Sequence, residues 1–225
     1  NMTISLPLLV FLGRKGNEII KGLPLRFVER LRERGQATHH RACPLHVSLT
    51  MVDPEGTKRL AWEIMDENNV EVLLYVFATD VIMEGNKCKG VIIDSKRGRE
   101  VIYAKSIVDC TGDGDILYRT GAEMKYGNDQ GIPQPPTLMF SMRGVDSRKL
   151  RDAVADHPEI YDIDYIPNEF FRPMDNCTFV GFRNQIRQAR EAGYHLPVER
   201  TIFMTGMEED EWWVNMSRVN GIDAT

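Results

Sequence analysis

The sequence has 225 residues, and its 28 Lys and Arg against 33 Asp and Glu give a formal net charge of −5 at pH 7. A chain of this length with 42% hydrophobic residues can bury a core of its own, so it needs no disulfides to fold. The acidic balance, with a pI of about 5.6, is unlike the basic surface of nucleic-acid-binding domains, and we expect no nucleic-acid partner.

Location can be judged from the first residues and the cysteines. The longest apolar run covers residues 4–12, whereas a membrane-spanning helix takes about 20 residues, so we expect no membrane span. No basic segment precedes this run and no small-residue cleavage site follows it, which argues against a secretory signal. The cysteines form no CxxC motif, and Cys88 and Cys110 fall in predicted strands. These features favour reduced thiols and a cytoplasmic protein.

Two helices are predicted in the first third of the chain. The first covers about residues 24–34, because Pro24 opens and Gly35 closes a stretch with apolar residues at helical spacing. The second begins after Asp53, whose carboxylate can cap the first amides, with Pro54 at the first helical position.

The next part of the chain has the pattern of β-structure. Residues 70–78 are almost continuously apolar and are predicted as a strand. Residues 81–83 and 90–94 flank a Gly-Asn turn as a hairpin, and residues 101–104 follow a second turn as a third antiparallel strand. The pattern therefore predicts a small antiparallel β-meander.

Residues 106–110 are predicted as another short strand, which ends in the turn 111–115 before one or two helical turns. Small residues after a buried strand let the backbone approach a ligand closely, and a following helix N-terminus attracts phosphate. Gly112 and Gly114 lack the third glycine of a dinucleotide fingerprint, however. A β-turn capped by its own aspartates is therefore an equally good interpretation.

The character of the chain changes after residue 127. A proline-rich connector covers residues 131–136, and we place a domain boundary there, between residues 1–127 and 128–225. Strands are predicted at 137–143, 200–205 and 211–219, and helices at 147–155 and 184–192. Trp212 and Trp213 are adjacent in a strand, so we expect one indole in the core and the other at a surface or interface.

Taken together, these segments resemble a known family. The matching segments are Val52-Asp53-Pro54-Glu55, the meander, Ile107 to Asp115, Gly121-Ala122, Pro136 to Phe140 and Val214 to Asp223. They look like the FAD-dependent oxidoreductases of the glutathione-reductase-type flavin fold, in the fumarate-reductase-like branch. The resemblance implies an α+β fold: a β-meander and part of an FAD-binding domain in residues 1–127, then a mixed α+β substrate or cap domain in residues 128–225. It also implies flavin-mediated hydride transfer on a small-molecule substrate.

The sequence departs from the family pattern in two respects that bear on FAD binding. The family opens with a βαβ unit whose Gly-x-Gly-x-x-Gly motif holds the FAD pyrophosphate, and this sequence contains no such motif. The family also continues into a second flavin-contacting segment, so we expect an internal fragment that is inactive and free of FAD on its own, with apolar surface that favours a homo-oligomer. The alternative hypothesis is a non-catalytic α+β binding or assembly module without a redox cofactor.

The resemblance also implies site residues. The candidate FAD-binding residues are Ala78, Thr111, Gly112, Asp113, Gly114 and Asp115. Of these, Ala78 matches the position where the strand backbone meets adenine, and Thr111 and Gly112 match the turn against adenosine. Helix capping explains the two aspartates equally well. Arg218 is the one candidate for a substrate carboxylate, whereas the arginines at 172, 183, 187 and 190 fit solvated helix faces. No catalytic residue can be assigned.

A second cluster contains His39, His40, Cys43 and His46, residue types that can ligate zinc. Four ligands within eight residues would be cramped without a supporting hairpin, so we favour a polar loop and expect no metal site. A nucleophilic role for Cys43 would require a lowered thiol pKa, which the sequence does not reveal.

Overall fold

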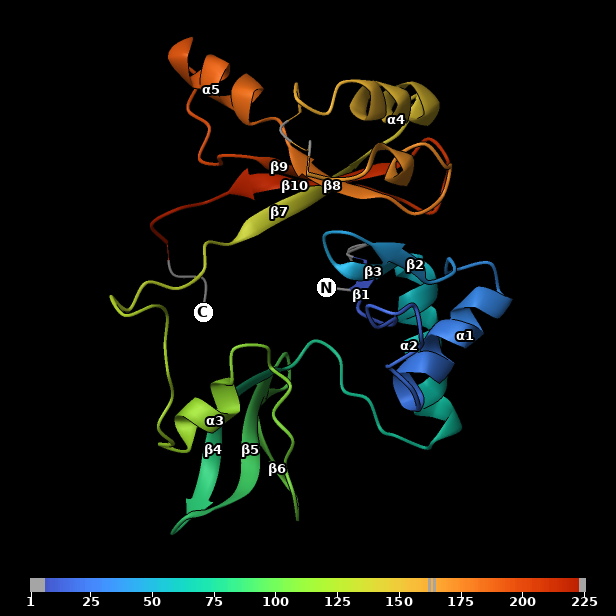
Figure 1. Ribbon diagram of the computed structural model, residues 1–225. Helices are drawn as coiled ribbons and strands as arrows, with labels where there is room; N and C mark the ends of the chain where they lie inside the picture. The colour runs from blue at the N-terminus through green and yellow to red at the C-terminus, as the bar shows by residue number, and fades with distance from the viewer. Residues whose placement is uncertain (1–6, 162, 164, 223–225) are drawn as a thin grey trace. The chain divides into compact units, whose positions relative to one another are not determined.

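The computed structural model describes residues 7–161, 163 and 165–222 (Figure 1). This part of the chain forms five α-helices, one 3-10 helix (Asn168–Phe170) and three antiparallel sheets, which confirms the predicted α+β class. None of its helices is long and apolar enough to span a membrane. Contacts divide the described residues into two compact units: 7–68 with 135–222, and 69–134. The domain assignment concerns the family's FAD-binding and substrate domains and remains a prediction.

The N-terminal part of the first unit packs two helices against a small sheet. The helices are α1 (Leu23–Glu33) and α2 (Pro54–Glu67), and the sheet has the order β1 (Leu8–Leu9), β3 (Val47–Thr50), β2 (Arg41–Cys43). As predicted, Asp53 caps α2 by accepting a hydrogen bond from the Gly56 amide. Side chains including Val28, Leu31 and Leu60 fill the core between these elements.

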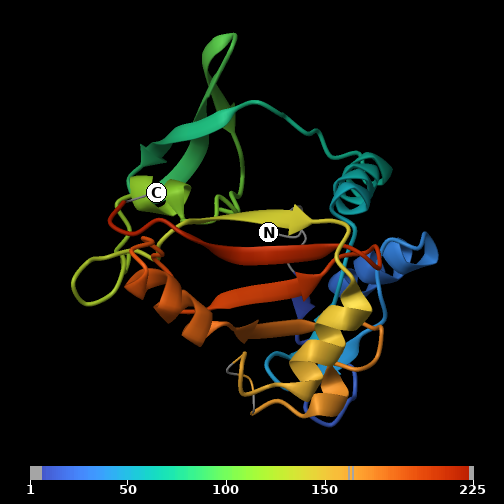
Figure 2. The same cartoon turned by 90° about the horizontal axis from the view of Figure 1, so that it is seen from above.

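A four-stranded antiparallel sheet forms the rest of the first unit. Its order is β7 (Thr137–Met142), β10 (Trp212–Arg218), β9 (Thr201–Thr205), β8 (Thr178–Gly181). Helices α4 (Ser147–Asp156) and α5 (Arg183–Glu191) lie on the same side of this sheet (Figure 1), towards its two ends (Figure 2). As expected for one of the two indoles, Trp212 is 1% exposed in the core with Phe171 and Phe179, while Trp213 is half-buried.

The buried Arg151 and the half-buried Arg41 fix the segment that precedes β8. Arg151 of α4 donates hydrogen bonds to the carbonyls of Pro173 at 2.7 Å and Asp175 at 2.5 Å. Arg41 of β2 donates to the carbonyls of Phe170, at 2.5 Å, and Asn176. Strand β2 and helix α4 therefore both hold this segment.

The second unit is the predicted β-meander. Strands β4 (Phe77–Glu84), β5 (Lys87–Ser95) and β6 (Gly98–Tyr103) pair in chain order, and the short helix α3 (Asp115–Arg119) packs against β4. Ile93 and Ile116, each 6% exposed, are its most deeply buried large apolar side chains in the described part.

Two predicted strands are wrong. Only Phe77 and Ala78 of the 70–78 prediction lie in a strand, and residues 106–110, with Cys110 exposed among them, are irregular. An apolar run forms a strand only where a neighbouring strand satisfies its amides and carbonyls. Within the described residues no strand pairs with residues 70–76 or 106–110. The apolar pattern alone does not show whether a partner strand is present.

Candidate functional site

Asp109 organises the turn that the sequence singled out. Its Oδ1 accepts hydrogen bonds from the Thr111 amide at 3.0 Å and the Thr111 hydroxyl at 2.7 Å. Its Oδ2 accepts one from the Leu117 amide at 2.8 Å. The Thr111 hydroxyl in turn accepts from the Asp115 amide at 2.9 Å. The Thr111 and Leu117 amides, with the Thr111 hydroxyl, hold the pKa of the Asp109 carboxyl below its usual value.

Sequence reasoning did not select Asp109 as a site residue. The signal was present, because an aspartate two residues before a threonine commonly accepts hydrogen bonds from the backbone that follows it. Asp109 and Thr111 bond the amides that open α3, whose N-cap Gly114 has no side chain to do so. The capping role that the sequence left open for Asp113 and Asp115 is thus taken by other residues.

The two glycines of the turn adopt backbone conformations that side chains disfavour. Gly112 has φ +101° and Gly114 has φ +77°. A Cβ on Gly114 would lie 2.8 Å from the Met124 Cε, whereas a Cβ on Gly112 would meet no atom within 4 Å. The backbone at Gly112 is therefore open on the side from which a ligand could approach.

The remaining FAD candidates lie in the same unit as the turn. Asp113 is exposed and Asp115 is half-buried. Ala78 is half-buried near the start of β4, opposite Ile93, and β4 is the strand against which α3 packs. The fold therefore gathers the strand of Ala78 and the turn that precedes α3 in one small unit.

The histidine and cysteine cluster does not converge. The His40 ring stacks on Phe11 with centroids 4.5 Å apart, and its Nδ1 lies 2.5 Å from the Thr50 hydroxyl. The Cys43 Sγ lies 3.9 Å from the His46 Nδ1. Burial raises the pKa of the Cys43 thiol, which opposes nucleophilic activation. Among the described residues, no group of three or more His, Cys, Asp or Glu side chains could hold a metal ion.

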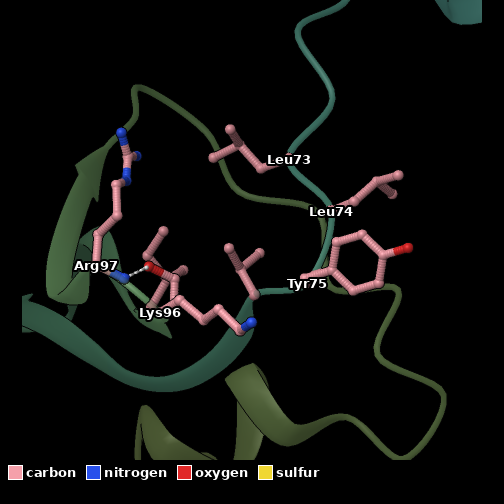
Figure 3. A pocket seen from close by; sticks show the side chains of 8 residues that line it. Leu73, Leu74, Tyr75, Lys96 and Arg97 are labelled. Atoms are coloured by element: carbon pink, nitrogen blue, oxygen red, sulfur yellow. Dashed lines mark hydrogen bonds between the residues drawn. The ribbon is translucent and has the colours of Figure 1, made fainter.

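A hollow of about 490 Å³ in the second unit was not anticipated from the sequence. Figure 3 shows Leu73, Leu74 and Tyr75 on the extended segment before β4, with Lys96 and Arg97 from the turn between β5 and β6. The Arg97 amide donates to the Ser95 hydroxyl at 3.1 Å. The lining of the hollow combines apolar side chains with Lys96 and Arg97 and holds no carboxylate, thiol or imidazole.

Arg218 belongs to the first unit, whereas the turn belongs to the second. It is exposed at the end of β10 and lines a hollow of about 930 Å³ together with Arg190. Arg172 instead forms ion pairs with Asp156 at 2.7 Å and Asp152 at 3.8 Å on the surface of α4.

Comparison with known protein families identifies the family of the chain. The model of the family described as FAD dependent oxidoreductase matches residues 1–223. No curated protein matches the chain. The matched range takes in both compact units, so the β-meander and the four-stranded sheet are parts of one family sequence.

Proposed function

Because the chain belongs to the family of FAD-dependent oxidoreductases, we propose that it contributes one wall of an FAD site and the substrate-facing domain of a flavoenzyme. FAD, when bound, supplies the hydride chemistry. The protein's part is to hold the adenosine end of the cofactor at the turn 111–115 and to shape a pocket for a small molecule with residues from 137 onward. The match to the family over residues 1–223 carries this proposal.

The chemistry of the turn supports adenosine rather than pyrophosphate as its ligand. The amides of residues 112, 113 and 114 have no hydrogen-bond partner within the described residues, so they can donate to a ligand oxygen. The carboxylates of Asp113 and Asp115 would repel phosphate, but they accept hydrogen bonds from ribose hydroxyls. We assign the ribose to this turn and adenine to the backbone near Ala78.

The experiment uses the product of the complete reading frame. The purified protein should carry flavin absorbance, and the Gly112→Val variant should lose FAD, because valine resists φ +101° and places methyl groups in the open approach. Val81→Ile, in β4, is the matched control for added volume in the same unit. Unchanged FAD retention in Gly112→Val would remove the turn from the FAD site.

The 225-residue chain on its own is expected to bind FAD weakly. It lacks Gly-x-Gly-x-x-Gly, and each lost hydrogen bond to a charged phosphate oxygen weakens binding by about 1.5 to 3 kcal/mol. Titration of this chain with FAD should give no saturation in the micromolar range. Stoichiometric micromolar binding would mean that the flavin site lies elsewhere.

A non-catalytic binding module is the second candidate function. It would predict that the product of the complete reading frame is colourless and transfers no electrons to an artificial acceptor.

We also propose a cytoplasmic location, supported by four cysteines that are all unpaired.

A further inference from the structure

The first unit carries a concentration of positive charge around α5. Arg183, Arg187 and Arg190 are spaced i, i+4 and i+7, so they share one stripe of the helix. They line a hollow of about 410 Å³ with Glu199. The adjoining hollow of about 930 Å³ shares Arg190 and Glu199 and adds Arg218. We call the two hollows together the basic trough.

Several exposed arginines of this protein pair with carboxylates, as Arg172 does with Asp156 at 2.7 Å, whereas others, such as Arg59, form no ion pair within the described residues. In the described part of the chain, none of the four arginines of the trough has a carboxylate partner. Glu199 is the one acid of the lining. Positive charge left unpaired in a concave surface, on a chain of net charge −5, attracts an anionic ligand.

One wall of the trough is held in place by Arg190. Its Nε donates to the Leu196 carbonyl at 2.9 Å and its Nη2 to the Val198 carbonyl at 2.8 Å. These bonds fix the segment that follows α5 and leave the Arg190 Nη1 and the guanidinium of Arg218 for a ligand. Tyr194, 68% exposed, and Pro197 add an aromatic and an aliphatic surface to the same hollow.

We propose that the basic trough binds a nucleoside polyphosphate. Arginine binds phosphate through paired N–H donors, and its guanidinium is charged at every physiological pH, so Arg190 and Arg218 suit the phosphates. Tyr194 and Pro197 suit the flat base, because every base has a face that stacks on an aromatic ring. Residues 183 to 190 extend about 10 Å along the helix axis, which accommodates a chain of phosphates. The residues of the basic trough lie in the first unit, whereas the residues of the FAD site proposed above lie in the second.

The test is equilibrium dialysis of the full chain with ATP, pyrophosphate, adenosine and a short polyglutamate peptide. ATP should bind saturably and more tightly than pyrophosphate, because only ATP uses Tyr194. Arg218→Gln should weaken ATP binding at least about tenfold, which corresponds to about 1.4 kcal/mol. Tyr194→Ala should weaken ATP but leave pyrophosphate unchanged. Arg59→Gln, an exposed arginine on α2, is the matched control and should bind like the wild type.

The outcomes that overturn this proposal are distinct from those that overturn the FAD site. Absence of saturable ATP binding, or equal ATP affinity in Arg218→Gln and the wild type, would refute the trough as a nucleotide site. Tighter binding of polyglutamate than of ATP, lost in Arg218→Gln, would identify an acidic protein surface as the occupant instead. Loss of ATP binding in Gly112→Val would place the nucleotide at the FAD turn, whereas retained ATP binding in that variant supports a separate site.

Discussion

Replacing Arg151 by leucine removes the cation that fixes the segment before β8. The Arg151 side chain is 3% exposed and lies over the Trp212 ring, with the guanidinium carbon 5.5 Å from the ring centroid. It donates to the carbonyls of Pro173 and Asp175 at 2.7 and 2.5 Å, and to that of Phe171 at 3.4 Å. Leucine keeps part of the volume but donates to none of them.

The expected loss of stability follows from the carbonyls that no longer have a donor. A buried carbonyl without a donor costs about 1 to 3 kcal/mol. Phe171 is a buried residue, whereas Pro173 and Asp175 are exposed, so water can replace part of what their carbonyls lose. The opposing term is the cost of burying a guanidinium, which also lowers the pKa of Arg151. Because the groups left unpaired dominate the effect of removing one partner, we expect the free energy of unfolding to fall by about 2 kcal/mol.

Urea unfolding followed by tryptophan fluorescence measures this change. Arg148→Leu is the matched control, because Arg148 is on the same helix and exposed and makes one hydrogen bond, to the Arg172 carbonyl at 2.9 Å. It should change the free energy of unfolding by less than about 1 kcal/mol. A loss below about 1 kcal/mol in Arg151→Leu would refute the reasoning, since the carbonyls would then have found water or other donors.

Three further predictions follow from the first and second units. Burial lowers the pKa of His40 and His46, so the unfolded chain binds more protons than the folded one at acidic pH. The free energy of unfolding should therefore be constant above pH 6.5, the ordinary histidine pKa, and fall as the pH drops below that value. A constant free energy of unfolding between about pH 5 and 8 would contradict this prediction. Asp53→Ala should cost about 1 kcal/mol in urea unfolding by uncapping α2, and a neutral result would show that water replaces the cap. A thiol reagent should label exposed Cys110 in the native protein but not buried Cys177, whose pKa is raised to about 12, and equal labelling rates would indicate opening of the core.

Local signals predicted the parts of the fold that local interactions decide. The cap at Asp53, the proline and glycine at the ends of α1, and the turns of the meander all depend on residues within about four positions of each other. The predicted strand over residues 70–78, apart from Phe77 and Ala78, and the one over 106–110 were wrong for the opposite reason. A strand depends on a partner strand that can lie anywhere in the chain, and an apolar run does not show which segment that partner is.

The same distinction applies to the candidate sites. Gly112 and Gly114 were recognisable because glycine is the residue type that readily adopts the positive φ found at both positions. The basic trough joins α5 to the end of β10, and this proximity follows from strand order in the sheet rather than from spacing in the sequence. The role of Arg41 was equally hidden, because it meets the Phe170 carbonyl 129 positions away.

The first unit is interrupted, since residues 69–134 lie between its two parts in sequence. A ribosome releases the chain from its N-terminus, so α1, α2 and β2 emerge well before the residues that complete their packing. Arg41 has no carbonyl at Phe170 or Asn176 to bind until more than half of the remaining chain has been made. During that interval the hairpin of β2 and β3 exposes Cys43 and Leu49, which the finished unit buries. Synthesis rate across the intervening meander therefore sets how long this apolar surface is open to chaperones and to misassembly.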